Sequence, residues 1–289
     1  MTKCPWWLSG LLPFEHASIP SDRSDVESLR GFVGPAGTRT SYLRCPNPQR
    51  RDDTILLIHG AGMNARTWSS QLRGLSEEHD VIAVDLPGHG ASHLPDGADL
   101  DTYVEAANAV LEDRGGPVVI AGHSLGGAVA IALAAHKPDR VKGLMLLSTC
   151  LRLSHANRRV DELLHALPMP LRKVLLDASM HAMFGPGASG QAVQHGLQDL
   201  LACPPETVDR DIEIARAMDL EDAARSLRIP VRLLCGSADS VTPVSASQYL
   251  VDLIPGARLE VVHAAGHMLP LERPDTVGER ILQFANSLR

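Results

Sequence analysis

The chain has 289 residues, of which 44% are hydrophobic and 21% are charged, a usage that is ordinary for a globular protein. The formal net charge of −7 gives no electrostatic reason to expect binding to nucleic acid or to an anionic membrane. No apolar stretch reaches the roughly 18 residues that a membrane span needs. We therefore expect a small-molecule partner, with no nucleic acid and no membrane span. The oligomeric state is not readable from these features.

The cysteines indicate a reducing compartment. They are scattered, odd in number and lack the spacing of a metal site or a disulfide framework: Cys4, Cys45, Cys150, Cys203 and Cys235. Cys150 and Cys235 lie in or beside apolar runs, which predicts buried thiols. The N-terminus lacks the long apolar region and cleavage site of a signal peptide. These features together predict a cytoplasmic protein.

The predicted elements alternate between strands and helices. Residues 1–30 mix Pro, Ser and acidic residues and predict an irregular arm, and 31–46 predict a hairpin at a sheet edge. Short apolar runs at 54–59, 81–85, 118–121, 143–148, 231–235 and 259–263 predict strands buried on both faces of a parallel sheet. Apolar residues recur at helical spacing over 100–111 and 277–288. This alternation predicts an α/β fold.

Residues 149–227 interrupt the alternation. They contain no clear strand but several short helical patterns separated by Pro and Gly. An insertion after a strand's carboxyl end lies over the place where open α/β sheets bind ligands. We therefore predict a core at 31–148 and 228–289 with a helical cap at 149–227 that selects the substrate.

The most informative motif is Gly122-His-Ser124-Leu-Gly126, which follows an apolar run and precedes a run of small residues. This G-x-S-x-G pattern in a strand–turn–helix context is typical of a nucleophile elbow. The two glycines permit a strained turn that exposes the hydroxyl of Ser124. The following helix directs its N-terminus at the site, so the Leu125 N–H is a candidate donor to an oxyanion.

A serine hydroxyl needs a base, and the base needs a group that holds its tautomer. Asp239 and His267 each lie just beyond one of the last two predicted strands. The order Ser124, Asp239, His267 along the chain is the order that this kind of site uses. We therefore predict a catalytic triad of these three residues.

With these motifs in place, the chain resembles the alpha/beta-hydrolase superfamily, specifically its capped serine esterase-like branch. The resemblance rests on five ordered segments between residues 57 and 274: the motif at 59–62, the motif at 85–92, the elbow, the Asp239 turn and the motif at 266–274. It implies a mostly parallel central sheet flanked by helices, with an inserted helical cap. It also implies that the Ala61 N–H is the second oxyanion donor and that His59 supports this loop.

Other polar residues have structural interpretations. His89 and Asp85 belong to a Gly-rich turn, which we expect them to shape. Asp211, Asp219 and Asp222 are alternative acids, but their pattern predicts solvated helix positions. The histidines of the predicted cap lack metal-ligand spacing, and no nucleotide-binding glycine pattern occurs, so we expect no metal and no cofactor.

Apolar residues near these motifs are candidates for the substrate pocket: Met63, Leu151, Met180, Met183, Phe184 and Met268. The predicted reaction is hydrolysis of a small, largely apolar carboxylic ester, or of a lactone or thioester, through an acyl-serine intermediate. Carbon–carbon bond hydrolysis, acyl transfer and perhydrolysis on the same triad remain alternatives. A ligand-binding or signalling protein that retains the fold is a further alternative.

Overall fold

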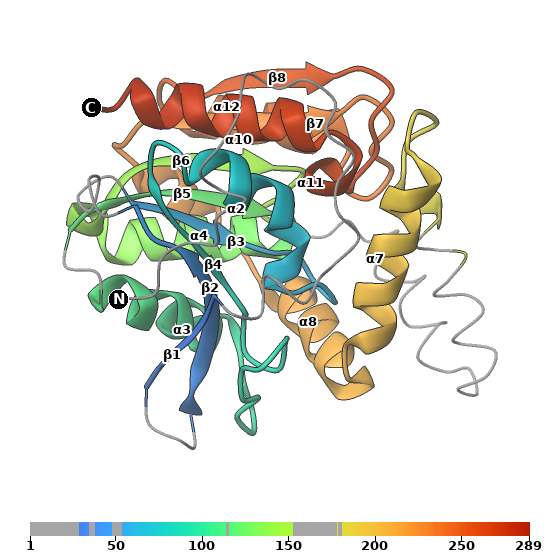
Figure 1. Cartoon of the computed structure of the whole chain (residues 1–289). Coiled ribbons are helices and arrows are strands. Elements are labelled where there is room, and N and C mark those ends of the chain that lie inside the picture. Colours follow the sequence, from blue (N-terminus) through green and yellow to red (C-terminus); the bar gives the residue numbers. More distant parts are fainter. Residues whose placement is uncertain (1–28, 35–37, 48–53, 114–115, 153–177, 179–180) are drawn as a thin grey trace.

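The structure, a computed structural model, describes residues 29–34, 38–47, 54–113, 116–152, 178 and 181–289. Its centre is an eight-stranded sheet with the strand order β1-β2-β4-β3-β5-β6-β7-β8 (Figure 1). The strands are β1 (Arg30–Val33), β2 (Thr40–Cys45), β3 (Thr54–Ile58), β4 (Asp80–Val84), β5 (Val118–His123), β6 (Val141–Leu147), β7 (Val231–Gly236) and β8 (Arg258–Val262). The predicted arm lies outside the described residues, apart from its last two.

The sheet is parallel from β4 through β8, and β1 and β2 add an antiparallel edge. The hairpin predicted at a sheet edge is therefore confirmed. The prediction that every later run is buried on both faces is wrong for β8. Among the described strands it pairs only with β7, and Val261 is 44% exposed. Its apolar residues predicted a central strand, but its place at the end of the sheet leaves it open to solvent.

Helices cover both faces of the sheet. They are α2 (Ser69–Leu75), α3 (Leu100–Glu112), α4 (Leu125–His136), α10 (Val244–Leu253), α11 (Leu269–Glu272) and α12 (Pro274–Asn286), with short 3₁₀ turns η3 (Ala65–Trp68) and η4 (Pro138–Arg140). The apolar core is accordingly divided in two. Ile58 and Ile120 pack in the cluster that includes α3 and α4, while their neighbours Leu57 and Val119 pack in the cluster that includes α2 and α12. This alternation follows from the two-residue period of a strand.

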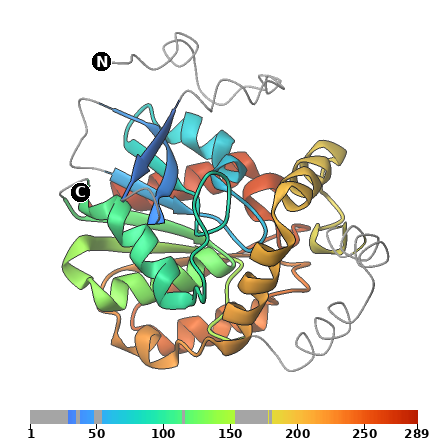
Figure 2. The ribbon, with the colours of Figure 1, turned by 90° about the horizontal axis from the view of Figure 1, so that it is seen from below.

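Between β6 and β7 in the sequence, the helices whose full extent the structure describes are α7 (Gly190–Ala202), α8 (Pro205–Ala217) and α9 (Glu221–Ser226). In both views α7 and α8 lie along one side of the molecule (Figures 1 and 2). Between 149 and 227 the described residues contain no strand. Residues 153–177 and 179–180 lie outside the described residues, and the division into a core and a cap stays a prediction.

No helix in the described part of the chain is long and apolar enough to cross a membrane. None of the four cysteines that the structure describes forms a disulfide, and Cys150 and Cys235 are buried as predicted. Parallel strands place their carboxyl ends at one edge of the sheet, where open α/β sheets bind ligands. Ser124, Asp239 and His267 follow β5, β7 and β8, so the topology gathers them at this edge.

Candidate active site

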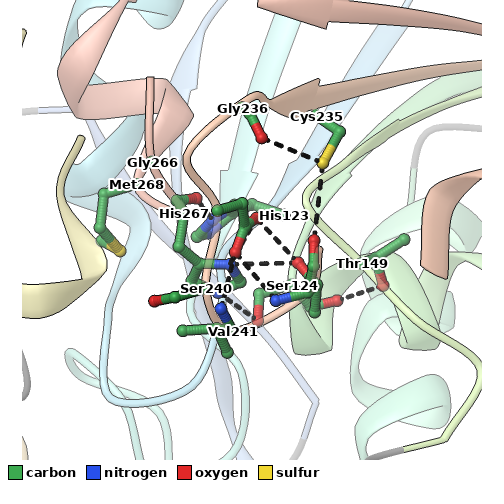
Figure 3. Close-up of polar contacts among 12 residues, drawn as sticks. His123, Ser124, Thr149, Cys235, Gly236, Ser240, Val241, Gly266, His267 and Met268 are labelled. Atoms are coloured by element: carbon green, nitrogen blue, oxygen red, sulfur yellow. Dashed lines mark hydrogen bonds and ion pairs between the residues drawn. The ribbon is translucent and has the colours of Figure 1, made fainter. Parts of the chain in front are cut away.

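Ser124 lies in the sharp turn between β5 and α4. Its backbone φ is 51° and its ψ is −119°, a conformation outside the regions that L-residues normally occupy. Two contacts hold the turn: the Ser124 N–H donates to the Leu147 carbonyl at 3.0 Å, and the Thr149 hydroxyl donates to the Ser124 carbonyl at 2.7 Å (Figure 3). Thr149, two residues after the end of the neighbouring strand β6, therefore stabilises the elbow, which the motif alone did not predict.

Close backbone approach explains the glycines of the elbow. A Cβ on Gly122 would lie 2.5 Å from the Gly126 carbonyl oxygen, and a Cβ on Gly126 would lie 2.4 Å from the His59 carbonyl oxygen. Real Cβ atoms do not approach backbone oxygens so closely. The two glycines thus let the elbow fold tightly against the loop that begins at His59.

The three residues predicted as the triad are brought together. His267 Nε2 lies 3.0 Å from Ser124 Oγ, and His267 Nδ1 lies 3.0 Å from Asp239 Oδ2 (Figure 3). The side chain of His267 is 5% exposed and that of Asp239 is fully buried. A hydroxyl, an imidazole and a carboxylate are therefore in hydrogen-bonding series, which is the arrangement that nucleophilic catalysis by serine requires.

The carboxylate of Asp239 is ionised and is held in place by hydrogen bonds. Its carboxylate accepts from the N–H groups of Val241 and Thr242 at 2.9 and 2.8 Å and from the Thr242 hydroxyl at 2.9 Å. Burial raises the pKa of Asp239, but hydrogen bonding and charge attraction from His267 and the Thr242 N–H outweigh burial and lower it to about 2. A carboxylate that stays charged can orient an imidazole and stabilise its protonated form.

The loop that carries His267 is held by a buried carboxylate. Glu272 accepts from the N–H groups of Gly266 and Met268, on either side of His267, at 2.9 and 3.0 Å. It also accepts from the Gly185 N–H at 2.9 Å, and the His267 N–H donates to the Met183 carbonyl at 2.7 Å. Sequence reasoning missed Glu272, although its place in the motif at 266–274 was a usable signal.

The loop from His59 to Met63 lies against the elbow. A Cβ on Gly60 would lie 3.0 Å from Ser124 Cβ. His59 Nδ1 lies 2.8 Å from the Gly60 carbonyl, and His59 Nε2 accepts from the Leu86 N–H at 3.0 Å. The ring is therefore a neutral imidazole with its proton on Nδ1, and burial lowers the pKa of His59 to about 3. His59 supports the loop, as the resemblance implied.

The two candidate oxyanion donors flank Ser124. Leu125 is the first residue of α4, where a backbone N–H has no partner within the helix. Ala61 is exposed in the loop that packs on the elbow. Within the described part of the chain neither N–H donates a hydrogen bond to the protein. Both are thus available to a bound oxyanion, and their role stays a proposal.

The candidate pocket residues fall into two groups. Met63 and Met268 form a buried cluster to which Met183 and Phe184 add partly buried side chains. Leu151 lies elsewhere, in the large core cluster on the α3 and α4 face. Met180 lies outside the described residues. Met268 follows His267 in the chain, and the Met183 carbonyl accepts from the His267 N–H, so the first group lies beside His267.

One acid differs from its prediction. Asp219 and Asp222 are exposed as predicted, but the solvated position predicted for Asp211 is wrong. Asp211 on α8 is fully buried and accepts hydrogen bonds from Gly62, His89 and Tyr103. The helical pattern could not reveal this burial, because the residues that cover Asp211 come from distant parts of the sequence. Asp85 is likewise buried, and its carboxylate accepts from the Ala65 N–H at 2.7 Å.

The described residues include no group of three or more His, Cys, Asp or Glu side chains placed to hold a metal ion.

A second histidine, His123, lies beside His267. His123 Nε2 donates to the His267 carbonyl at 2.8 Å, and the two ring centroids are 5.1 Å apart (Figure 3). Burial and the neighbouring His267 lower the pKa of His123 to about 3, so this ring is neutral.

Comparison with known proteins agrees with this geometry. A pimeloyl-[acyl-carrier protein] methyl ester esterase of Neisseria meningitidis serogroup C is 32% identical over 223 residues, which cover 74% of this chain and 86% of that protein. The structure of the esterase RhEst1 from Rhodococcus sp. ECU1013 superposes with a TM-score of 0.79 at 26% identity, covering 89% of this chain and 98% of the other. A hydrolase from Pseudomonas aeruginosa PA01 superposes with a TM-score of 0.78 at 25% identity, covering 88% and 97%.

The family comparison covers most of the sheet. Residues 55–280 match the model of the alpha/beta hydrolase family. This range includes the elbow, the Asp239 turn and the His267 loop. The chain belongs to the alpha/beta hydrolase family.

Proposed function

We propose that this hydrolase cleaves small, largely apolar carboxylic esters through an acyl-serine intermediate. The Neisseria meningitidis relative and RhEst1 are both named as esterases. The observation that carries the mechanism is the series of contacts from Ser124 Oγ to His267 Nε2 and from His267 Nδ1 to Asp239, at 3.0 Å each. Such a series activates a serine hydroxyl that is otherwise a weak nucleophile.

The proposed reaction has two steps. His267 Nε2 takes the Ser124 proton as Ser124 Oγ attacks the ester carbonyl, and Asp239 stabilises the imidazolium. The N–H groups of Ala61 and Leu125 bind the oxyanion, and collapse of the tetrahedral intermediate releases the alcohol with the proton from His267. Water then attacks the acyl-serine with His267 as base, and the carboxylic acid leaves.

The proposed selectivity comes from the apolar cluster beside this site. Met63, Met183, Phe184 and Met268 offer no charge to a substrate. Apolar contacts discriminate weakly, by about 1–3 kcal/mol per methylene, so we expect several acyl lengths to be accepted. We assign the segment 149–227 to a cap that supplies part of this surface. We also propose a cytoplasmic location, because the described cysteines form no disulfide.

The relatives suggest one concrete substrate to include. Several curated relatives are esterases of pimeloyl-[acyl-carrier protein] methyl ester, in Neisseria meningitidis and in Vibrio campbellii, at 32% and 28% identity. A methyl ester at the end of a long acyl chain is compatible with an apolar pocket beside Ser124. A methyl ester of this kind is therefore our most specific substrate candidate.

The test is a substrate panel with product identification. It includes p-nitrophenyl esters of graded acyl length, a lactone, a thioester and dimethyl pimelate, each with the wild-type chain and with Ser124→Ala. We expect ester turnover with release of one acid and one alcohol, and a loss of several orders of magnitude in Ser124→Ala. Lactone or thioester turnover alone would correct the substrate class. Absence of all hydrolysis, or equal rates in the two proteins, would refute the proposed function.

A further inference from the structure

The carboxylate of Asp211 lies at the meeting point of three separated segments. It is fully buried on α8, and its Oδ2 accepts from the Gly62 N–H at 2.8 Å and from His89 Nε2 at 2.9 Å. Its Oδ1 accepts from the Tyr103 hydroxyl at 2.7 Å. A buried carboxylate with three donors is fixed in orientation. One of these donors, Gly62, lies in the loop that carries the candidate oxyanion donor.

The protonation states follow from the partners. His89 Nδ1 lies 3.1 Å from the Pro87 carbonyl and Nε2 faces Asp211, so both ring nitrogens face acceptors and both carry protons. Burial lowers the pKa of His89, but the charge and hydrogen bond of Asp211 raise it well above its usual value. Tyr103 stays a neutral phenol, because burial and Asp211 raise its pKa. The buried pair of Asp211 and His89 therefore carries compensating charges.

Two consecutive peptide groups of the oxyanion loop are held by hydrogen bonds to neighbouring groups. The Gly60 carbonyl accepts from His59 Nδ1 at 2.8 Å and from the Met63 N–H at 3.2 Å. In a planar trans peptide this carbonyl and the Ala61 N–H point in opposite directions. The next peptide is anchored through the Gly62 N–H to Asp211. The direction of the Ala61 N–H is therefore set by His59 on one side and by Asp211 on the other.

Two helices of the predicted cap, α7 and α8, also contact this loop and the adjacent turn. Gly62 has a φ of +67°, and a Cβ there would lie 2.7 Å from Leu200 Cδ1 on α7. On the adjacent turn, the Thr207 hydroxyl of α8 donates to the Gly88 carbonyl at 3.3 Å. The hydrogen bonds of Asp211 are thus surrounded by close contacts between α7, α8 and the core. Movement of α8 would withdraw the acceptor of the Gly62 N–H.

We propose that Asp211 is a positioning residue of the oxyanion hole: it ties α8 to the Gly62 N–H and so keeps the Ala61 N–H directed at the reacting carbonyl. This inference rests on the proposed function, because it assigns Asp211 a part in that reaction. Asp211 does not touch the reacting atoms, and its effect passes through the Ala61–Gly62 peptide. The cap would then complete the catalytic geometry as well as select the substrate.

The first test is a pair of variants on one helix. Asp211→Asn keeps the size of the side chain but replaces one acceptor oxygen with an NH₂ that faces donors. Glu213→Gln is the matched control, since Glu213 lies on α8 with a side chain 57% exposed. Loss of an oxyanion donor lowers kcat by about 10²–10³-fold, so its misdirection should lower kcat by about 10- to 100-fold. The KM for a p-nitrophenyl ester should change little, and the control should match the wild type.

A second readout reports on the oxyanion directly. An alkyl trifluoromethyl ketone adds Ser124 Oγ to its carbonyl and forms a hemiketal, whose ¹⁹F signal follows the ionisation of the hemiketal hydroxyl. Directed N–H donors lower the pKa of that hydroxyl, so this pKa should be higher in Asp211→Asn than in the wild type and in Glu213→Gln. A folded Asp211→Asn with wild-type kcat and wild-type hemiketal pKa would overturn the inference and leave the proposed function standing. A wild-type chain that forms no adduct and hydrolyses no ester would overturn both.

The wild type supplies a readout for the case in which Asp211→Asn does not fold. The Gly62 amide proton, bonded to a buried carboxylate, should exchange with solvent much more slowly than amides of exposed loops. Its ¹⁵N–¹H signal should also lie at low field. Rapid exchange at Gly62 would overturn the inference, because the proposed anchor would be absent.

Discussion

Acidification should destabilise this protein through two buried, neutral imidazoles. His59 accepts from the Leu86 N–H and donates to the Gly60 carbonyl, so a second proton would place an N–H against an N–H. His123 is equally buried. Burial lowers the pKa of each ring to about 3. In the unfolded chain the pKa of an imidazole is about 6.5.

The sign and size of the effect follow from proton linkage. Below about pH 6.5 the unfolded chain binds a proton at each ring that the native chain does not, so the free energy of unfolding falls as pH falls. Between pH 7.5 and 5.0 the loss is about 2 kcal/mol for each ring, or about 4 kcal/mol for His59 and His123 together. This size holds for any native pKa well below 5. Carboxylates titrate mostly at lower pH, so the window isolates the histidines.

The assay is urea unfolding at several pH values across this window, for the wild type, His59→Gln and His263→Gln. The decrease should be about 2 kcal/mol smaller in His59→Gln than in the wild type, whatever the stability of the variant at pH 7.5, because one of the two rings is absent. His263 carries its ring on the surface and serves as the control. If His59→Gln kept the full wild-type decrease, the assignment of a neutral, buried His59 would be refuted.

Three further predictions concern the site. Glu272→Gln should destabilise the chain by about 1–3 kcal/mol and lower kcat, because the Gln side chain replaces one of the two oxygens that accept from three buried N–H groups with a donor NH₂. Urea unfolding and ester kinetics should show no such change in Glu279→Gln, whose side chain is 44% exposed. Asp239→Asn should lower kcat by about 10³-fold or more. Asp239→Asn should also be less stable than the wild type by about 2 kcal/mol above pH 3.8, and this difference should vanish as the pH falls towards 2, because the pKa of Asp239 is about 2 in the folded chain. A difference in urea unfolding that stays constant with pH would contradict this prediction. Phe184→Ala should change the ratio of kcat/KM between medium and short acyl esters by about tenfold, and an unchanged ratio would remove Phe184 from the pocket.

The parts of the fold that the sequence predicts are those that local patterns encode. The elbow is readable because a strand, two glycines in tight contact and a helix of small residues are adjacent in the chain. Asp239 and His267 are readable because each follows a strand whose carboxyl end must lie at the same edge of the sheet. This topology brings His267 within hydrogen-bonding distance of Ser124, and Asp239 within hydrogen-bonding distance of His267.

The parts that were not predicted depend on packing between distant segments. Asp211 lies at a position that a helical pattern marks as polar, and only the contacts of α8 with Gly62, His89 and Tyr103 bury it. The exposure of β8 depends on its being the last strand of the sheet, which its apolar composition does not encode.

The measurement that tests the central claim most directly is the identification of the acylated residue. The wild-type chain is mixed with a p-nitrophenyl ester, quenched in acid within the first turnovers and analysed by intact-mass and peptide mass spectrometry. We expect the mass of one acyl group on the peptide that contains Ser124, and no such mass in Ser124→Ala. Acylation at another residue, or ester turnover that persists in Ser124→Ala, would contradict the account.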